Sequence, residues 1–229
     1  VAYESLSRIE NKNIDINIEE LFCLAEAYGC VWKLEKLCRD KALKASMNKP
    51  SGTKIFLNVD GQIFQDSNFI SGFTNRKLEK FGLSNEDIVF EITERTDIEN
   101  YVLLQTIMNH YIDQGYQIAL DDVGAGYSGL NRVVNTTPNY LKDDIELVRN
   151  IHLSKSKQSM MKLLVEYCDE MGLKLVAEGI ETQEELECIC NLHVHYGQGY
   201  YLGLPDCKFN GISSQALQYL MNIHGMIKT

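Results

Sequence analysis

The sequence lacks the features of several protein classes. It has no continuous apolar run of about 18 residues and no basic segment followed by an apolar stretch, so neither a transmembrane helix nor a signal peptide is predicted. Basic residues number 22 against 32 acidic ones, a formal net charge of −10, which excludes a basic field for DNA or an anionic membrane surface. We therefore expect a cytoplasmic protein whose segment shown here contacts neither DNA nor a membrane.

Cysteine spacing and proline content further restrict the kind of protein that the sequence can encode. The 7 cysteines include no C-x-x-C pair, which favours reduced thiols and disfavours a structural zinc site. Only 3 prolines interrupt 229 residues, of which 45% are apolar, enough for one large core. We expect a single domain over residues 1–229.

Short apolar runs alternate with amphipathic helical patterns along the chain. A repeated strand–helix order predicts parallel strands joined by crossover connections, an α/β fold. Asn17 is placed to cap a helix that stops at Gly29, and Thr182 to open another. Strands are expected at 1–4, 54–59, 87–93, 116–121, 139–143, 173–178 and around 196–202.

Polar residues stand at or near the carboxyl ends of these expected strands. For any single one of them, an ordinary solvent-exposed residue at a strand end is as good an explanation as a functional residue. In a parallel barrel, however, those ends meet at one face, where the loops build the active site. The residues are Glu4, Asn58, Glu91, Asp121, Asp122, Lys142, Asp144, Glu178 and Gln198.

The adjacent pair Asp121 and Asp122 requires a positive partner, because two neighbouring carboxylates repel each other as water is excluded. Both can reach one site only if the chain bends after the strand, which the glycines at 124 and 126 permit. Carboxylate and amide oxygens suit Mg²⁺ or Mn²⁺. Two such ions roughly 3.5–4 Å apart clamp the attacking and leaving oxygens of a phosphodiester.

Lys142 and Glu178 are the candidate catalytic residues beside such a metal pair. Lys142 is suited to hold a nucleophilic water or a phosphate oxygen, although a solvated strand-end lysine is the alternative. Glu178 is suited to take the proton of that water or to ligate a metal, and the sequence leaves both roles open.

A competing motif is G-x-G-x-x-G at Gly124, Gly126 and Gly129, with Glu146 about twenty residues on, as a dinucleotide-binding fold requires. We disfavour it, because the two preceding aspartates would repel a pyrophosphate. The motif also lies in the middle of the chain.

In the order and spacing of its motifs, the chain resembles the EAL domain of bacterial cyclic di-GMP phosphodiesterases. The resemblance implies a TIM-like (β/α)8 barrel and hydrolysis of cyclic di-GMP to linear pGpG with two Mg²⁺ or Mn²⁺ ions. The family's first, antiparallel strand is expected to be absent, so that the chain would be a fragment of a longer protein. The motifs are YESLSR (3–8), FLNVD (56–60), EITE (91–94), DDVGAGYSGL (121–130), LKDD (141–144), AEGIET (177–182) and QGYYLG (198–203).

The resemblance also implies individual roles. Lys142 would support the catalytic water and Glu178 would be the general base or a further ligand. Arg8 would contact phosphate, Asp144 and Gln198 would bind substrate, and Glu94 would steady the loop after the aspartate pair. A homodimer and upstream sensory or cyclase domains are further implied. The metal ligands would be Glu4, Asn58, Glu91, Asp121 and Asp122.

Departures from the family pattern leave a second hypothesis open. Ser5 and Ser7 replace the usual Ala and Leu, and Val123 and Ala125 replace Phe and Thr. Asp143 stands where an apolar residue is usual, and burying it unpaired would cost several kcal/mol. A catalytically inactive domain that acts as a cyclic di-GMP receptor is therefore the alternative. We favour the enzyme, because no predicted ligand is lost.

Overall fold

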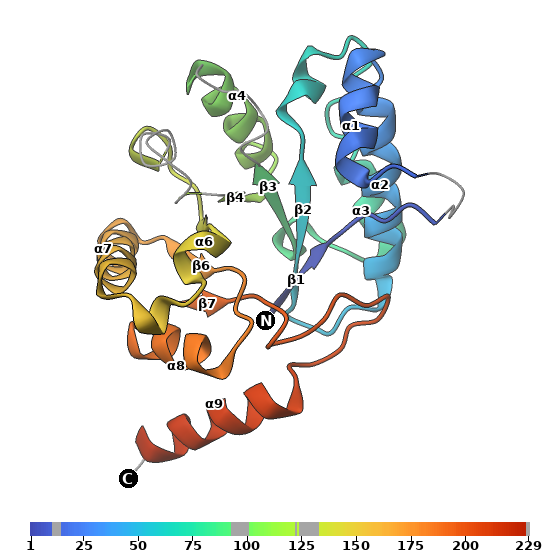
Figure 1. Cartoon of the computed structure of the whole chain (residues 1–229). Coiled ribbons are helices and arrows are strands. Elements are labelled where there is room, and N and C mark those ends of the chain that lie inside the picture. The colour runs from blue at the N-terminus through green and yellow to red at the C-terminus, as the bar shows by residue number, and fades with distance from the viewer. Residues whose placement is uncertain (11–14, 93–100, 122, 124–132, 228–229) are drawn as a thin grey trace. The chain divides into compact units, whose positions relative to one another are not determined.

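The structure, a computed structural model, describes residues 1–10, 15–92, 101–121, 123 and 133–227 (Figure 1). Its contacts divide the chain into two compact units, Val1–Leu120 and Asp121–Thr229. Each unit alternates strands with helices, as the sequence predicts.

The first unit is built on four parallel strands. They are β1 (Ala2–Ser5), β2 (Lys54–Val59), β3 (Ile88–Ile92) and β4 (Gln117–Leu120), and each pairs in parallel with the next. All five residues of β3 are buried, as expected for a strand covered on both faces. The family's antiparallel first strand is not among the strands of the described residues.

Helices connect these strands. α1 (Ile18–Ala27) and α3 (Asn75–Phe81) both contact α2 (Val31–Ala45), which packs against β2, and α4 (Tyr101–Ile112) leads into β4. Short 3₁₀ turns lie at Ser46–Asn48, Gly61–Gln65 (η2) and Asn85–Asp87. Asn17 caps α1 as predicted: its side chain accepts from the Glu20 amide at 2.8 Å, and Glu20 reciprocates.

Aromatic rings fill the core of the first unit. Phe90 on β3 lies 4.1 Å from Tyr111 and 4.9 Å from Tyr116, measured between ring centroids. These rings and that of Trp32 on α2 are each at most 4% exposed. The core thus joins α2 and α4 to the strands whose ends carry the candidate ligands.

The second unit has a shorter parallel sheet of β5 (Tyr140–Asp143), β6 (Lys174–Ala177) and β7 (Tyr196–Gly197). Its helices are α6 (Ile145–Val148), α7 (Lys155–Met171), α8 (Gln183–Asn191) and α9 (Ser214–Ile227), with a 3₁₀ turn at Ile151–Leu153. Thr182 opens α8 with a capping box, as predicted.

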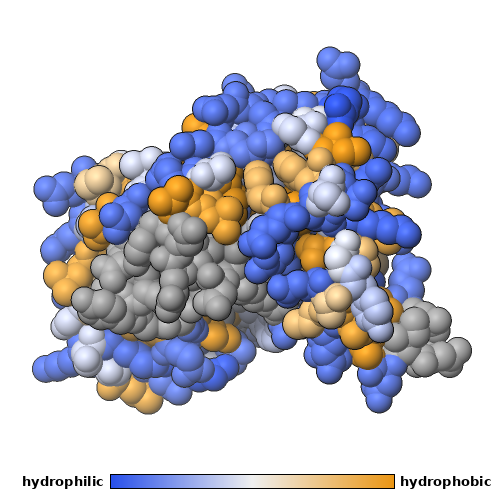
Figure 2. Space-filling model, turned by 90° about the horizontal axis from the view of Figure 1, so that it is seen from above, coloured by the Kyte–Doolittle hydropathy of each residue, from blue (hydrophilic) through white to orange (hydrophobic). Residues whose placement is uncertain are grey.

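The surface hydropathy and the state of the cysteines agree with what the composition predicts. Hydrophilic residues make up much of the face seen in Figure 2, with smaller hydrophobic patches among them. All seven cysteines carry free thiols. Within the described ranges, no helix has the length and apolar character needed to cross a bilayer.

Candidate active site

Three of the predicted metal ligands share one face of the first sheet. Glu4 is the register partner of Phe56, two residues before Asn58, and Asn58 is the register partner of Glu91. Because side chains alternate along a strand and register partners point the same way, all three project from the same face at or near the strand ends. The Asn58 side-chain amide donates to Glu4 Oε1 at 2.9 Å.

The donor chemistry of this face fits a hard divalent cation. Two carboxylates and an amide oxygen are ligands that Mg²⁺ and Mn²⁺ accept. Glu91 is only 1% exposed, whereas Asn58 is exposed. Among the described residues, no group of three or more His, Cys, Asp and Glu side chains is placed to hold a metal. The donor types on this face are therefore compatible with part of a coordination shell.

A buried lysine organises the candidate site of the second unit. Lys142 on β5 has a side chain only 2% exposed, and its Nζ lies 2.5 Å from Glu178 Oε1 and 3.7 Å from Asp121 Oδ1. The Val123 amide donates to the Lys142 carbonyl at 3.0 Å, which ties the chain after Asp121 to β5. The two predicted catalytic residues and one predicted ligand are thus brought together.

Backbone geometry after β6 sets the position of Glu178. Gly179 has φ +72°, and a Cβ there would overlap the side chain of Ile145, so only glycine fits. The Gln198 amide donates to the Ala177 carbonyl at 2.8 Å, and the Ile180 amide donates to the Gln198 carbonyl at 3.0 Å. The backbone of Gln198 therefore flanks the Glu178 turn on both sides.

Other predicted site residues are placed differently. Asp144 is the N-cap of α6 and accepts from the Glu146 amide at 2.8 Å. Arg8 is exposed and donates to the carbonyl of its neighbour Ser7 at 2.9 Å. Neither contact tests a role in binding substrate. Asp122 and Glu94 lie outside the described residues.

Asp143 is buried, as its place in β5 suggests, with 1% of its surface exposed. It follows Lys142 in the strand and so points to the opposite face. Burial, together with the charges of Asp144 and Glu178, raises the pKa of Asp143 to about 8. No ion pair to its carboxyl group occurs within the described part of the chain, so the neutral acid is the favoured form near pH 7.

One polar cluster was missed by the sequence-based prediction. Glu35 and Arg39 on α2 are both buried and bind each other, and Glu35 also contacts the segment after Asn58. Their i,i+4 spacing was the available signal, but such pairs usually lie on exposed helix faces. The pair belongs to no recognised motif, so its burial could not be expected from local sequence.

Comparison with known proteins gives a family match. The EAL domain family model matches residues 1–205. The chain is 30% identical over 156 residues to a protein of Escherichia coli strain K12 named "Probable cyclic di-GMP phosphodiesterase PdeG". This match covers 68% of the chain and 31% of PdeG, so the chain spans less than a third of that relative.

Solved structures give the same match. The FimX EAL domain of Pseudomonas aeruginosa, bound to c-di-GMP, superposes with a TM-score of 0.80 at 20% identity, over 92% of this chain and 86% of that one. BlrP1 of Klebsiella pneumoniae, in a manganese and cyclic di-GMP complex, superposes with a TM-score of 0.76 at 27% identity, over 86% of this chain and 50% of that one. The likeness confirms the predicted fold class, the TIM-like α/β fold of the EAL type.

Proposed function

The chain belongs to the EAL domain family, and we propose that it is a metal-dependent phosphodiesterase that hydrolyses cyclic di-GMP to linear pGpG. The observation that carries the proposal is the buried Lys142, held 2.5 Å from Glu178 and 3.7 Å from Asp121. A buried cation between two carboxylates is costly to maintain for stability alone. Its placement at strand ends is typical of a catalytic group.

Metal ligation is assigned to the oxygen donors at the strand ends. We propose Glu4, Asn58, Glu91, Asp121 and Asp122 as ligands of two Mg²⁺ or Mn²⁺ ions. When bound, such ions would supply charge neutralisation at the phosphodiester and a more acidic water. The manganese complex of BlrP1 supports a divalent ion in this family.

Lys142 and Glu178 would act directly on the reacting groups. In hydrolysis, a water oxygen forms a new bond to phosphorus and loses a proton, while one ester P–O bond breaks and the leaving oxygen takes up a proton to become a hydroxyl group. Lys142 would orient the water or hold a nonbridging phosphate oxygen, because its ammonium group is fixed by burial. Glu178 would accept the proton or serve as a further ligand; its contact with Lys142 is compatible with both roles.

The remaining roles are also proposals. Arg8 would contact phosphate, Asp144 and Gln198 would line the substrate pocket, and Glu94 would steady the loop after Asp122. A homodimer, upstream sensory or cyclase domains, a single domain over residues 1–229 and a cytoplasmic location stay predictions. DosP, a further relative, is named an oxygen sensor protein, which supports signal-linked regulation.

An assay of pGpG formation tests the function. The protein is incubated with cyclic di-GMP and Mn²⁺ or Mg²⁺, and products are separated by chromatography. We expect turnover by the wild type, none after chelation of the metal, and none in Glu178→Gln. Binding by calorimetry without any pGpG would instead support the receptor hypothesis, and the absence of both would exclude the two functions together.

A further inference from the structure

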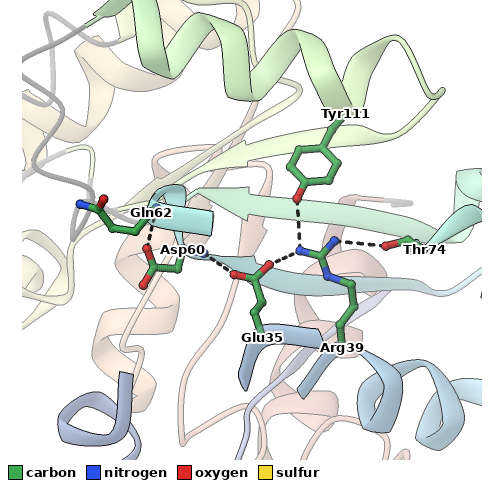
Figure 3. A network of polar contacts seen from close by, with 6 residues as sticks. All are labelled: Glu35, Arg39, Asp60, Gln62, Thr74 and Tyr111. Atoms are coloured by element: carbon green, nitrogen blue, oxygen red, sulfur yellow. Dashed lines mark hydrogen bonds and ion pairs between the residues drawn. The ribbon is translucent and has the colours of Figure 1, made fainter. Parts of the chain in front are cut away.

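Glu35 and Arg39 form a buried ion pair on α2, and Arg39 contacts the aromatic core of the first unit. Arg39 binds Glu35 through Nη2, which also donates to the Tyr111 hydroxyl at 3.1 Å, while Nη1 donates to Thr74 Oγ1 at 3.2 Å (Figure 3). Glu35 and Arg39 are 2% and 5% exposed. The guanidinium carbon lies 4.8 Å from the ring centroid of Phe90 on β3. Arg39 is thereby held by several partners at once.

The same pair reaches the segment that follows β2. Glu35 Oε2 accepts from the Asp60 amide at 3.0 Å, and Asp60 in turn accepts from the Gln62 amide at 2.8 Å to begin η2 (Figure 3). At the other end of η2, Asp66 accepts from the Trp32 amide at 3.1 Å, at the start of α2. The segment from Asp60 to Asp66 is therefore fastened to α2 at both ends.

We propose that Glu35, backed by Arg39, is a positioning residue that fixes the β2 carboxyl end and so orients Asn58 for metal binding. The inference rests on the proposed function, in which Asn58 is a metal ligand. Asp60 lies two residues beyond Asn58, and the intervening Val59 is 1% exposed, so the chain between them is packed. Glu35 thus acts on the ligand through the backbone.

The arrangement also reaches the next ligand strand. Phe90, under the Arg39 guanidinium, immediately precedes Glu91 on β3, and Asn58 is the register partner of Glu91. Because adjacent residues of a strand point to opposite faces, Arg39 contacts β3 on the face opposite Glu91. The Glu35–Arg39 pair consequently contacts the end of β2 and the face of β3 opposite Glu91, the two neighbouring strands that carry Asn58 and Glu91. Partners of this kind around metal ligands change metal affinity by roughly 10–100-fold when they are removed.

Mn²⁺ binding in the absence of substrate tests the inference. Electron paramagnetic resonance of the free ion gives the affinity of wild type, Glu35→Ala, Glu35→Gln and Asn58→Ala. We expect Glu35→Ala to weaken binding about tenfold or more. Glu35→Gln should weaken it less, because its carbonyl oxygen can still accept from the Asp60 amide. The loss caused by Glu35→Ala should be smaller in the Asn58→Ala background than in the wild type, since most of its effect is expected to act through Asn58.

Two control variants separate positioning from general stability. Leu78→Ala removes a side chain that is 3% exposed on α3, a comparable loss of core packing, and Thr74→Val removes only the outer contact of Arg39. Both should leave Mn²⁺ affinity within about twofold. Circular dichroism shows whether each variant is folded. If Glu35→Ala does not fold, Glu35→Gln decides the result.

The outcomes distinguish this inference from the proposed function. Unchanged Mn²⁺ affinity in folded Glu35→Ala, or in Glu35→Gln if Glu35→Ala does not fold, would overturn the positioning role even if the wild type forms pGpG. Weakened Mn²⁺ binding without pGpG formation by the wild type would overturn the enzymatic function and leave the positioning role intact. A wild type that binds no Mn²⁺ and forms no pGpG with either metal would overturn both.

Discussion

Lys142 is the residue on which the proposed chemistry depends most. Its ammonium group is almost fully buried, and two carboxylates face it. Desolvation of a lysine is expensive, so the two carboxylates must offset much of that cost. Both carboxylates, those of Asp121 and Glu178, also have roles in the proposed reaction. Their contacts with Lys142 would therefore serve stability and catalysis together.

Replacing Lys142 should separate catalysis from substrate binding. We expect Lys142→Met to lower kcat by about 100-fold or more, while cyclic di-GMP affinity changes far less. Rates of pGpG formation and calorimetric binding provide the two quantities. Lys174→Met is the matched control, because Lys174 is an exposed lysine on the adjacent strand β6. Equal losses in the two variants would argue against a catalytic role for Lys142.

Asp143 predicts a defined pH dependence of stability. Its pKa in the folded protein is about 8, raised chiefly by burial, against an ordinary value of 3.8. The folded state therefore binds the proton more tightly, so this contribution to stability is complete below pH 3.8 and is lost as the pH rises through about 8. An asparagine side chain at this position would remain neutral throughout. Accordingly, we expect Asp143→Asn to gain about 1–3 kcal/mol relative to wild type between pH 5 and pH 8.5.

Urea unfolding of both proteins at the two pH values measures this difference. Comparing wild type with the variant cancels the other titrating groups. A difference in the free energy of unfolding that does not change with pH would mean that Asp143 is not held as the neutral acid. The sequence predicted the unusual position of this residue, but its protonation depends on burial, which only the packed structure supplies.

At the scale of the elements, the turn between β6 and α8 is closely constrained by its sequence. Gly179 is left-handed and closely approached by Ile145, and Gly199 leaves no space, since a Cβ there would overlap the Ile180 backbone. Glu185 at the start of α8 accepts from the amides of Glu181 and Thr182 at 2.9 and 3.1 Å. These contacts fix the backbone that follows Glu178 and thereby the position of its side chain.

A glycine pair in the second unit tests this constraint. Gly172 at the end of α7 has φ +71° with no atom within 4 Å of its would-be Cβ, whereas at Gly179 both backbone strain and a clash apply. We expect Gly172→Ala to cost about 1–2 kcal/mol and Gly179→Ala at least about 3 kcal/mol. Only Gly179→Ala should also reduce turnover, because it displaces Glu178. Thermal or urea unfolding and the pGpG assay give both readouts; similar costs at the two sites would contradict the close approach.

Most elements could be predicted from the sequence because their signals are local. β2 matches the expected 54–59, and the caps at Asn17 and Thr182 follow from side chains three residues from their partners. The last strand was predicted too long, since β7 covers only Tyr196–Gly197. There the chain turns, with the Leu202 amide donating to the Gly199 carbonyl at 3.0 Å. Alternating apolar residues cannot reveal such a turn.

The candidate site was predictable to a similar degree. The prediction that polar residues at parallel strand ends converge agrees with the contacts of Asn58 with Glu4 and of Lys142 with Glu178, although the contacts themselves were not predicted. It gave no indication of Glu35, because a buried charge pair on a helix depends on partners from α4 and the end of β2 that are distant in sequence. Long-range polar contacts of this kind have no periodic pattern to detect.

At the scale of the whole molecule, the net charge is consistent with the proposed metal requirement. The chain carries a formal net charge of −10, and its proposed substrate is an anionic cyclic dinucleotide. Long-range electrostatics therefore oppose their association, and the proposed metal ions would reverse the sign of the local potential at the site. The proposed ligands run from Glu4 to Asp122, so just over half of the 229 residues must fold before the proposed cation site can form.

The Mn²⁺ dependence of single-turnover pGpG formation, compared between wild type and Glu91→Gln, tests the proposed metal site most directly. Glu91 is buried on the same strand face as Asn58, and the substitution removes its charge with little change of shape. We predict that the wild type requires the metal and that Glu91→Gln needs at least about tenfold more Mn²⁺ or forms no product. Product formation without a divalent metal, or an unchanged Mn²⁺ requirement in the folded variant, would contradict the assignment.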